Sequence, residues 1–387
     1  MFIKSAVRVF LGQKHVSVSC KFSKKDITEF AGNLLDYFHQ NSLDNFTPFR
    51  VCVYHNIAEA AEFVNNQIAK ALPEIPIDFI RQNSFTDGVI VIQLWLIQDH
   101  HLEVKRSSSV NYLSSPQVKW LVVSPSLYKP ADDIGYQYRT LFSEIMVENQ
   151  FWFSNIYPVR FWIYINSILP VDGMADNYQQ INSARISAFN FHHIPPVKKR
   201  PERYVPASTG IGTSGDHIVL SSLSVISPFV RIESLENDLQ TSAFDYPDKV
   251  SKNPPLFSRA VQIIHDSEIM LLISGTASII NHSSVYSGDI QRQLRQTLLN
   301  LANLINSAFH NPVIDEWNPS VFEIISSSAL QLVVYIKRHG DFDYVKSFID
   351  NNISERVDVI CLIADVCREE LLVEIEGIAF LSKETMI

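Results

Sequence analysis

The apolar and polar positions in the second half of the chain follow two alternating patterns. Two β-rich apolar runs, Leu256–Ile264 and Ile269–Gly275, flank a polar turn at residues 265–267, which predicts a hairpin. From Asp289 to Phe309 the apolar residues recur every three or four positions, as on one face of a helix. The other predicted elements are strands at Leu330–Ile336, Val357–Ile363 and Leu371–Phe380 and a short helix that includes Phe342 and Ile349. The resulting order, β-β-α-β-α-β-β, is typical of an α+β sheet backed by two helices.

The first half repeats this order in a fainter form. Helical spacing covers Tyr136–Val147 and Tyr178–Phe189, and apolar strands lie before and after each helix. We interpret the pattern as a degenerate duplication, in which two tandem α+β units each form a mixed sheet backed by helices. The join falls within residues 230–255, which are rich in Ser, Asp, Asn and Pro. The predicted domains are a degenerate N-terminal domain at residues 1–235 and a C-terminal domain at residues 236–387.

Composition and charge narrow the class of protein. The 387 residues are enough for about two domains. The net charge of −9 disfavours a nucleic-acid binder, because phosphate binding needs a basic surface. Charges interrupt the first 20 residues, and no apolar run reaches about 18 residues, so we expect neither a signal peptide nor a membrane-spanning helix. Four scattered cysteines without CxxC spacing indicate reduced thiols, and we therefore expect a cytoplasmic protein.

Two glutamates alternate with apolar residues in the last predicted strand. Side chains two positions apart in a strand share a face, so Glu374 and Glu376 lie on one face and Val373, Ile375 and Gly377 on the other. Two neighbouring carboxylates beside apolar groups raise the pKa of at least one of them, which suits a general acid at neutral pH. The alternative is that both carboxylates face solvent on an edge strand.

Several segments of the chain resemble a known superfamily. Pro255–Val261, Leu272–Ser278 and Val373–Gly377, with the predicted helix between them, resemble the Rid/YjgF-like (chorismate-mutase-like) fold. The segments that resemble one branch of it, the chorismatases, are Pro206–Gly212, Tyr246-Pro247, Ser274–Ile279, Asn281-His282, Ser287–Asp289 and Asp365–Gly377. The resemblance covers residues 155–387. It implies two tandem Rid/YjgF-like units, the N-terminal one degenerate, that cleave chorismate and release pyruvate without a metal or cofactor.

The resemblance assigns catalytic roles to three residues. Glu374 would be the acid that protonates the enolpyruvyl methylene of chorismate. Chorismatases that hydrolyse chorismate to a dihydroxycyclohexadiene carboxylate tend to have alanine at the Gly275 and Cys367 positions, whereas the aromatising type tends to have glycine and cysteine. The chain is similar to the aromatising type, which forms 3-hydroxybenzoate, alone or with 4-hydroxybenzoate. Gly275 would leave room at the ring, and Cys367 would steer the ring hydroxyl or shuttle a proton; without the resemblance, Cys367 indicates only a small buried residue.

Chorismate is a dianion, so its two carboxylates need cationic partners, for which arginine has the best geometry. By resemblance, the candidates are Arg259, Arg160 and Arg185, with Lys337 at a position where the family often has arginine. The resemblance adds Tyr246 as a hydrogen-bond donor. Surface salt bridges for the cations and core packing for the tyrosine are the alternatives.

Three other functions remain open at this point. A hydrolysing chorismatase is disfavoured by Gly275 and Cys367. A Rid-type imine deaminase is favoured by Arg356, which stands about where such enzymes bind a carboxylate, and disfavoured by the length of the chain. A non-catalytic binding module on the same fold is disfavoured by the presence of both Glu374 and Arg259. Rid proteins are trimers with sites between subunits; a tandem duplication would supply that interface within one chain, so we expect a monomer, with a trimer as the alternative.

Overall fold

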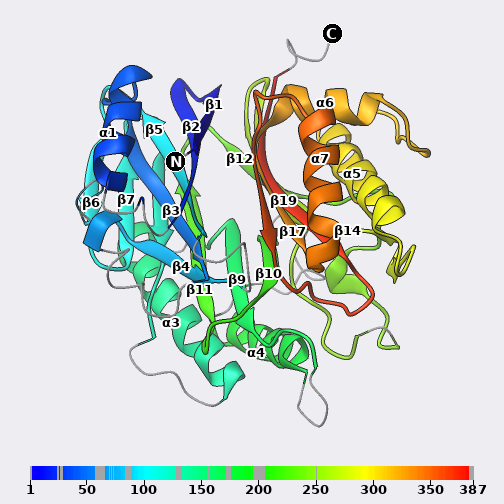
Figure 1. The fold of residues 1–387 in the computed structure, drawn as a ribbon. Helices are drawn as coiled ribbons and strands as arrows, with labels where there is room; N and C mark the ends of the chain where they lie inside the picture. Colours follow the sequence, from blue (N-terminus) through cyan, green and yellow to red (C-terminus); the bar gives the residue numbers. More distant parts are fainter. Residues whose placement is uncertain are drawn as a thin grey trace.

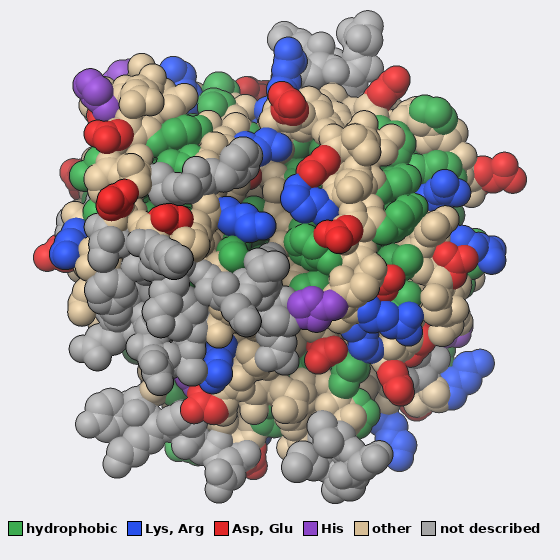
Figure 2. All heavy atoms as spheres, in the orientation of Figure 1, with side chains coloured by type: hydrophobic (Ala, Val, Ile, Leu, Met, Phe, Trp, Pro, Cys, Tyr) green, Lys and Arg blue, Asp and Glu red, His purple; other side chains and the backbone are tan. Residues whose placement is uncertain are grey.

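Three β-sheets surround the centre of the molecule, and the helices lie outside them (Figure 1). The computed structural model describes residues 2–23, 26, 29–56, 66–68, 70, 72, 74–82, 89–127, 133–154, 157–170, 176–192, 194, 205–249 and 251–382. None of the helices in these ranges is both long and apolar enough to cross a membrane. Acidic and basic side chains are interspersed over the described residues on the face shown in Figure 2.

The first sheet has the strand order β1-β2-β5-β3-β4. Its strands are β1 (Phe2–Phe10), β2 (Gln13–Ser23), β3 (Thr47–His55), β4 (Ile77–Arg81) and β5 (Val89–Gln98). Helix α1 (Phe30–Gln40) packs on its outer face, and residues 66–68, between β3 and β4, are also helical.

The second sheet has the order β10-β9-β11-β8-β7-β6. Its strands are β6 (Glu103–Arg106), β7 (Val110–Ser114), β8 (Lys119–Val123), β9 (Arg160–Asn166), β10 (Ala207–Thr213) and β11 (Val219–Ile226). Helices α3 (Ile134–Phe153) and α4 (Asn177–Phe191) cover its outer face. The side chains of Asp133 and Asp176 cap the two helices by accepting a backbone N–H from the first turn.

The third sheet has the order β12-β13-β14-β19-β17-β18. Its strands are β12 (Arg231–Leu235), β13 (Ala260–His265), β14 (Glu268–Ala277), β17 (Ala329–Ile336), β18 (Asp358–Ile363) and β19 (Val373–Ser382). Helices α5 (Ile290–Ser307), α6 (Ser320–Ser328) and α7 (Phe342–Asn352) cover its outer face. The short elements are β15 (Ile279–Ile280), β16 (Ser283–Ser284), η3 (Ala243–Asp245) and η4 (His339–Asp341).

The three sheets repeat one plan, which makes three units instead of the two predicted. In each sheet a central strand pairs in parallel with an edge strand (β3 with β4, β9 with β10, β17 with β18) and antiparallel with the strand that ends the unit (β5, β11, β19). The α+β class, the mixed sheets backed by helices and the tandem repetition are confirmed. The first unit was not predicted as a separate unit because polar side chains are buried on its inner face. His15, Ser17 and Ser19 of β2 are among them, and they interrupt the hydrophobic pattern of the sequence.

The units close head to tail into a ring. The parallel edge strand of each unit lies against the sheet of the next: β4 against β11, β10 against β14, and β18 against β2. All three sheets contribute to one central core, which contains Tyr54, Tyr164 and Tyr335 at equivalent positions on the central strands. The segment predicted as one N-terminal domain, residues 1–235, therefore holds two of the three sheets and also β12, which pairs with β13 of the third.

Candidate active site

A cavity of about 400 Å³ lies between the second and third sheets. This volume is within the range of roughly 300–1,000 Å³ that is usual for small-molecule sites. Six of the eight predicted site residues line it, namely Arg185, Tyr246, Arg259, Gly275, Cys367 and Glu374. Helix α4 and strands β9 and β10 form one wall, and strand β14 and the start of β19 form the other.

Glu374 lies on β19 between Ala277 of β14 and Tyr335 of β17. It is only 5% exposed and Glu376 only 3%, so the alternative of a solvent-facing pair is wrong. Burial is the main reason that the pKa of Glu374 rises to about 8, and the charge of Glu376 adds to the effect. The carboxyl is therefore protonated at neutral pH and able to act as a general acid.

Gly275 makes the space that the Glu374 carboxyl occupies. A Cβ atom at position 275 would overlap a carboxylate oxygen of Glu374, and it would also lie 3.3 Å from the Thr209 methyl group. We expected this glycine to leave room for the substrate ring. The structure adds that it leaves room for the acid itself, so the residue at position 275 controls where the acid lies.

Arg185 presents unpaired donors inside the cavity. Its side chain is 2% exposed, and its Nη1 donates to Ser208 Oγ at 3.3 Å. Nε and Nη2 have no partner among the described residues. Rings of Phe161 and Phe189 lie 5.7 and 5.3 Å from the guanidinium, whose pKa is lowered by burial. A buried cation with unused donors favours an anionic ligand.

A second buried guanidinium faces the cavity from the start of β13. Arg259 is 2% exposed, and its Nη2 donates to the Thr241 carbonyl at 2.9 Å and to the Tyr246 hydroxyl at 2.8 Å. Its Nε has no partner among the described residues. Tyr246 therefore orients Arg259, and the cavity holds two cations on opposite walls.

Cys367 also lines the cavity and lies near Glu374. Burial, and then the Glu374 charge, raise the pKa of the thiol to about 12, so it is neutral at physiological pH and acts as a weak hydrogen-bonding group rather than as a nucleophile. The Tyr178 hydroxyl at the start of α4 is its hydrogen-bonding partner.

Three functional residues in the wall were missed by the sequence analysis. Tyr178 contacts Cys367, and Ser208 connects Arg185 to Ser274 of the third sheet through its backbone N–H, 2.8 Å from Ser274 Oγ. Arg368 donates to the His282 carbonyl at 3.1 Å and to Ser284 Oγ at 3.0 Å. Arg368 could have been predicted from its position next to Cys367 in the sequence. No feature of the sequence marks Tyr178 or Ser208 in a comparable way.

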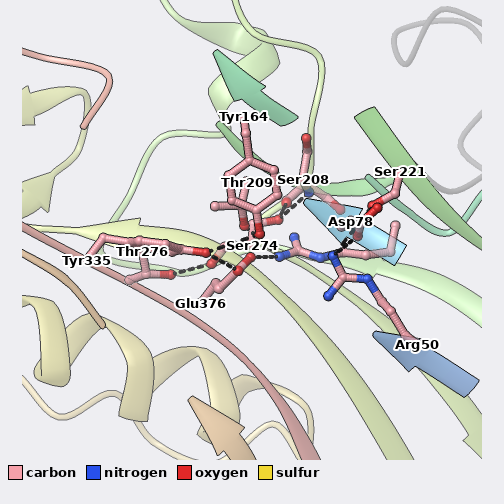
Figure 3. Close-up of polar contacts among 12 residues, drawn as sticks. Arg50, Asp78, Tyr164, Ser208, Thr209, Ser221, Ser274, Thr276, Tyr335 and Glu376 are labelled. Atoms are coloured by element: carbon pink, nitrogen blue, oxygen red, sulfur yellow. Dashed lines mark hydrogen bonds and ion pairs between the residues drawn. The ribbon is translucent and has the colours of Figure 1, made fainter. Parts of the chain in front are cut away.

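Arg160 and Lys337 do not line the cavity. Arg160 is buried behind its wall and forms an ion pair at 2.5 Å with Glu376. Figure 3 shows Glu376 among its polar neighbours. Lys337 donates to the Glu369 carbonyl at 2.6 Å. Arg356 lies in the exposed turn before β18 and not in the cavity wall, which removes the feature that favoured an imine deaminase.

Only one of the three units carries the acid. The residue opposite the central-strand tyrosine is Val91 in the first unit, Val219 in the second and Glu374 in the third. In the described part of the chain, no cluster of three or more His, Cys, Asp or Glu side chains is arranged to hold a metal.

Comparisons with known proteins show what the whole chain is similar to. No family model matches the chain. A chorismatase of Streptomyces hygroscopicus is 31% identical over 226 residues, which cover 57% of this chain and 61% of that protein. A 3-hydroxybenzoate synthase of the same organism is 29% identical over 252 residues, which cover 62% of this chain and 67% of that protein. The chain thus spans less than two thirds of the length of the chorismatase.

The fold comparison extends further than the sequence comparison. A crystal structure of a chorismatase matches with a TM-score of 0.65 at 22% identity and covers 86% of this chain and 93% of that one. At this level of identity the match establishes the fold. The chain is thus similar in sequence, over more than half of its length, to a protein named chorismatase, and over most of its length it shares the fold of a chorismatase structure.

Proposed function

We propose that the protein converts chorismate to 3-hydroxybenzoate and pyruvate. The observation that carries this proposal is a buried, protonated Glu374 in a cavity that also contains the unpaired donors of Arg185 and Arg259. The similarity to proteins named chorismatase and 3-hydroxybenzoate synthase supports the choice of substrate.

The two arginines suit a dicarboxylate. Each is buried and has at least one N–H without a partner among the described residues. Charge-assisted hydrogen bonds are strong in such a buried setting. We assign one carboxylate to Arg185 and the other to Arg259, with Arg368 as a further cation at the wall. Binding in this way would place the enolpyruvyl group toward Glu374.

The reaction begins with proton transfer. Glu374 donates its proton to the enolpyruvyl methylene, which becomes the methyl group of pyruvate. The oxygen of the ring hydroxyl then bonds to the neighbouring ring carbon that carries the enolpyruvyl oxygen, the C–O bond between that carbon and the enolpyruvyl oxygen breaks, and pyruvate leaves. The bond from the hydroxyl oxygen to its original ring carbon opens next, and loss of a ring proton makes the ring aromatic. Of the hydroxyl proton and the ring proton that are released, one completes the phenol and the other restores the proton on Glu374. Atoms balance without water, because the formulae of 3-hydroxybenzoate and pyruvate add up to that of chorismate.

Gly275 and Cys367 favour aromatisation over hydrolysis in this scheme. Hydrolysis would consume one water and give a cyclohexadiene diol. The Cys367 thiol, neutral and bonded to Tyr178, would orient the ring hydroxyl, and 4-hydroxybenzoate would arise where that orientation fails. We expect Cys367→Ala to divert product toward the diol, and a Cys361→Ala variant on β18 serves as the control.

The deciding experiment is incubation of the pure protein with chorismate and chromatography of the products. We expect equal amounts of pyruvate and hydroxybenzoate, and in D₂O one solvent deuteron in the pyruvate methyl group. No release of pyruvate would refute the proposal, and a diol without aromatic acid would reassign the protein to the hydrolysing type. For Cys367→Ala, an unchanged yield of hydroxybenzoate would dismiss the orienting role.

A further inference from the structure

Behind the cavity wall, a second carboxylate is buried in the centre of the molecule. Glu376 shares a face of β19 with Glu374, about 7 Å along the strand. One of its oxygens accepts from the Tyr335 hydroxyl at 2.6 Å and the other from Arg160 Nη2 at 2.5 Å (Figure 3). The side chains of Arg160 and Glu376 are 2% and 4% exposed, so the pair is cut off from solvent.

This ion pair is in contact with the wall of the cavity. Arg160 Nη2 also donates to Thr209 Oγ1 at 2.5 Å. The methyl group of the same threonine lies against the Gly275 position, where the Glu374 carboxyl is seated. A chain of direct contacts therefore runs from the acid through Gly275 and Thr209 to Arg160.

A buried ion pair is a costly way to hold a fold together, since apolar residues of similar volume often stabilise a core as well or better. The positions equivalent to Glu376 in the other two units are Gln93 and Ser221, opposite Cys52 and Trp162. At this strand position a carboxylate thus occurs only in the unit that also carries Glu374. This coincidence points to a role in the site.

We propose that Arg160 and Glu376 are positioning residues that balance each other's charge and so keep the Glu374 carboxyl protonated for catalysis. This rests on the proposed function in taking Glu374 as the acid. Without Glu376, the Arg160 cation would be unbalanced and would favour the ionised form of Glu374. Without Arg160, the Glu376 anion would favour the protonated form.

Other charged and titratable groups face Glu374 and stay constant across the test. They are Arg259 before β13, Cys367 and Arg368 before β19, and Tyr178 and Arg185 on α4. Arg259 and Arg368 favour the ionised carboxylate, whereas burial favours the protonated form. Because these groups are unchanged in the variants below, a shift in the titration of Glu374 reports the Arg160–Glu376 pair.

The test compares two single variants with the double variant. Glu376→Gln keeps the shape and one accepting oxygen for Arg160, while its amide N–H faces the Tyr335 hydroxyl. We expect the upper pH limb of kcat/KM for chorismate to move down by about one pH unit. Arg160→Met should move it up by a similar amount. In the double variant, the limb should return to the wild-type position. Arg160→Lys keeps the positive charge, so its limb should stay at the wild-type position.

A second readout is independent of the substrate. The infrared band of a protonated carboxyl, assigned to Glu374 by its loss in Glu374→Gln, can be titrated in each variant without chorismate. Asp78→Asn changes another buried ion pair, that of Arg50 and Asp78 at 2.6 Å, and should leave the band unshifted. Shifts in the same direction for both single variants, or none, would overturn the proposal. Failure of the wild type to release pyruvate would instead refute the proposed function.

Discussion

At the scale of single residues, the site depends on a carboxyl kept protonated by burial. Glu374 is one of few acidic side chains in the interior, and the pKa of about 8 results first from loss of solvent and then from the charge of Glu376. A general acid works best when its pKa is near the operating pH, because it must both give and regain its proton.

Glu374→Gln should lower kcat by about 10²- to 10⁴-fold, the usual contribution of a general acid. Since the folded state raises the pKa of this carboxyl, ionisation favours unfolding as pH rises from the unfolded-state value toward 8. The variant should therefore be at least as stable as the wild type at pH 8. Pyruvate release and thermal unfolding measure the two effects, with the exposed Glu355→Gln as control. Near-wild-type turnover by Glu374→Gln would remove this residue from the mechanism.

Gly275→Ala should displace the Glu374 carboxyl, because the new methyl group takes its place. The clash is with the end of a flexible side chain, so we expect little loss of stability but a fall in kcat on the order of 100-fold, as for a misplaced catalytic group. Gly340→Ala is the matched control, since a Cβ there meets nothing within 4 Å. If Gly275→Ala turned over at the wild-type rate, position 275 would not control the acid.

At the scale of elements, the cavity is built from the ends of strands and helices that local sequence signals define. Helix α4 begins after its Asp176 cap and carries Tyr178 in its first turn and Arg185 in its third. Helix α5 begins after Asp289, whose side chain accepts the Arg292 N–H at 3.0 Å, and it supports the third sheet from outside.

Asp289→Ala should cost about 1 kcal/mol of unfolding free energy through loss of the cap of α5. Because α5 does not line the cavity, the turnover of the folded protein should not change. Chemical denaturation gives the first value and pyruvate release the second. Asp289→Asn keeps a capping oxygen and should restore most of the stability. An Asp289→Ala protein as stable as the wild type would show that the cap contributes nothing here.

At the scale of the whole molecule, three sheets enclose one central core, and each unit supplies its parallel edge strand to the next. Separate copies of one unit would assemble through the surfaces between neighbouring units. In a closed ring within one chain, these surfaces are already buried against each other. A glutamate is present at only one of the three equivalent positions, so we expect a single catalytic interface in the ring.

We therefore expect the protein to be a monomer in solution. Sedimentation equilibrium over a hundredfold range of concentration should give the mass of one chain throughout. Chorismate turnover per chain should be independent of concentration over the same range. A trimer that dissociates with loss of activity would show instead that the catalytic site needs more than one chain.

Much of the third unit could be predicted from the sequence, because its outer helices and apolar strands have clear periodicity. The α5 helix, the β13–β14 hairpin and the shared face of Glu374 and Glu376 all follow from spacing alone. The first unit could not, because its inner strand faces bury polar side chains such as His15 and Ser17. His15 accepts a hydrogen bond from Trp95 of β5, and Ser17 donates to Gln331 and Asp358 only when the first and third sheets meet.

The sequence by itself determined the α+β class, the repetition of one unit and the identity of the residues similar to those of the chorismatases. Only the tertiary structure decided which candidates lie together. It placed Arg185 and Arg259 in the cavity with Glu374 and placed Arg160 behind the wall on Glu376. The physical reason is that spacing along a strand fixes the face on which a side chain lies, whereas burial and partners depend on what packs against that face.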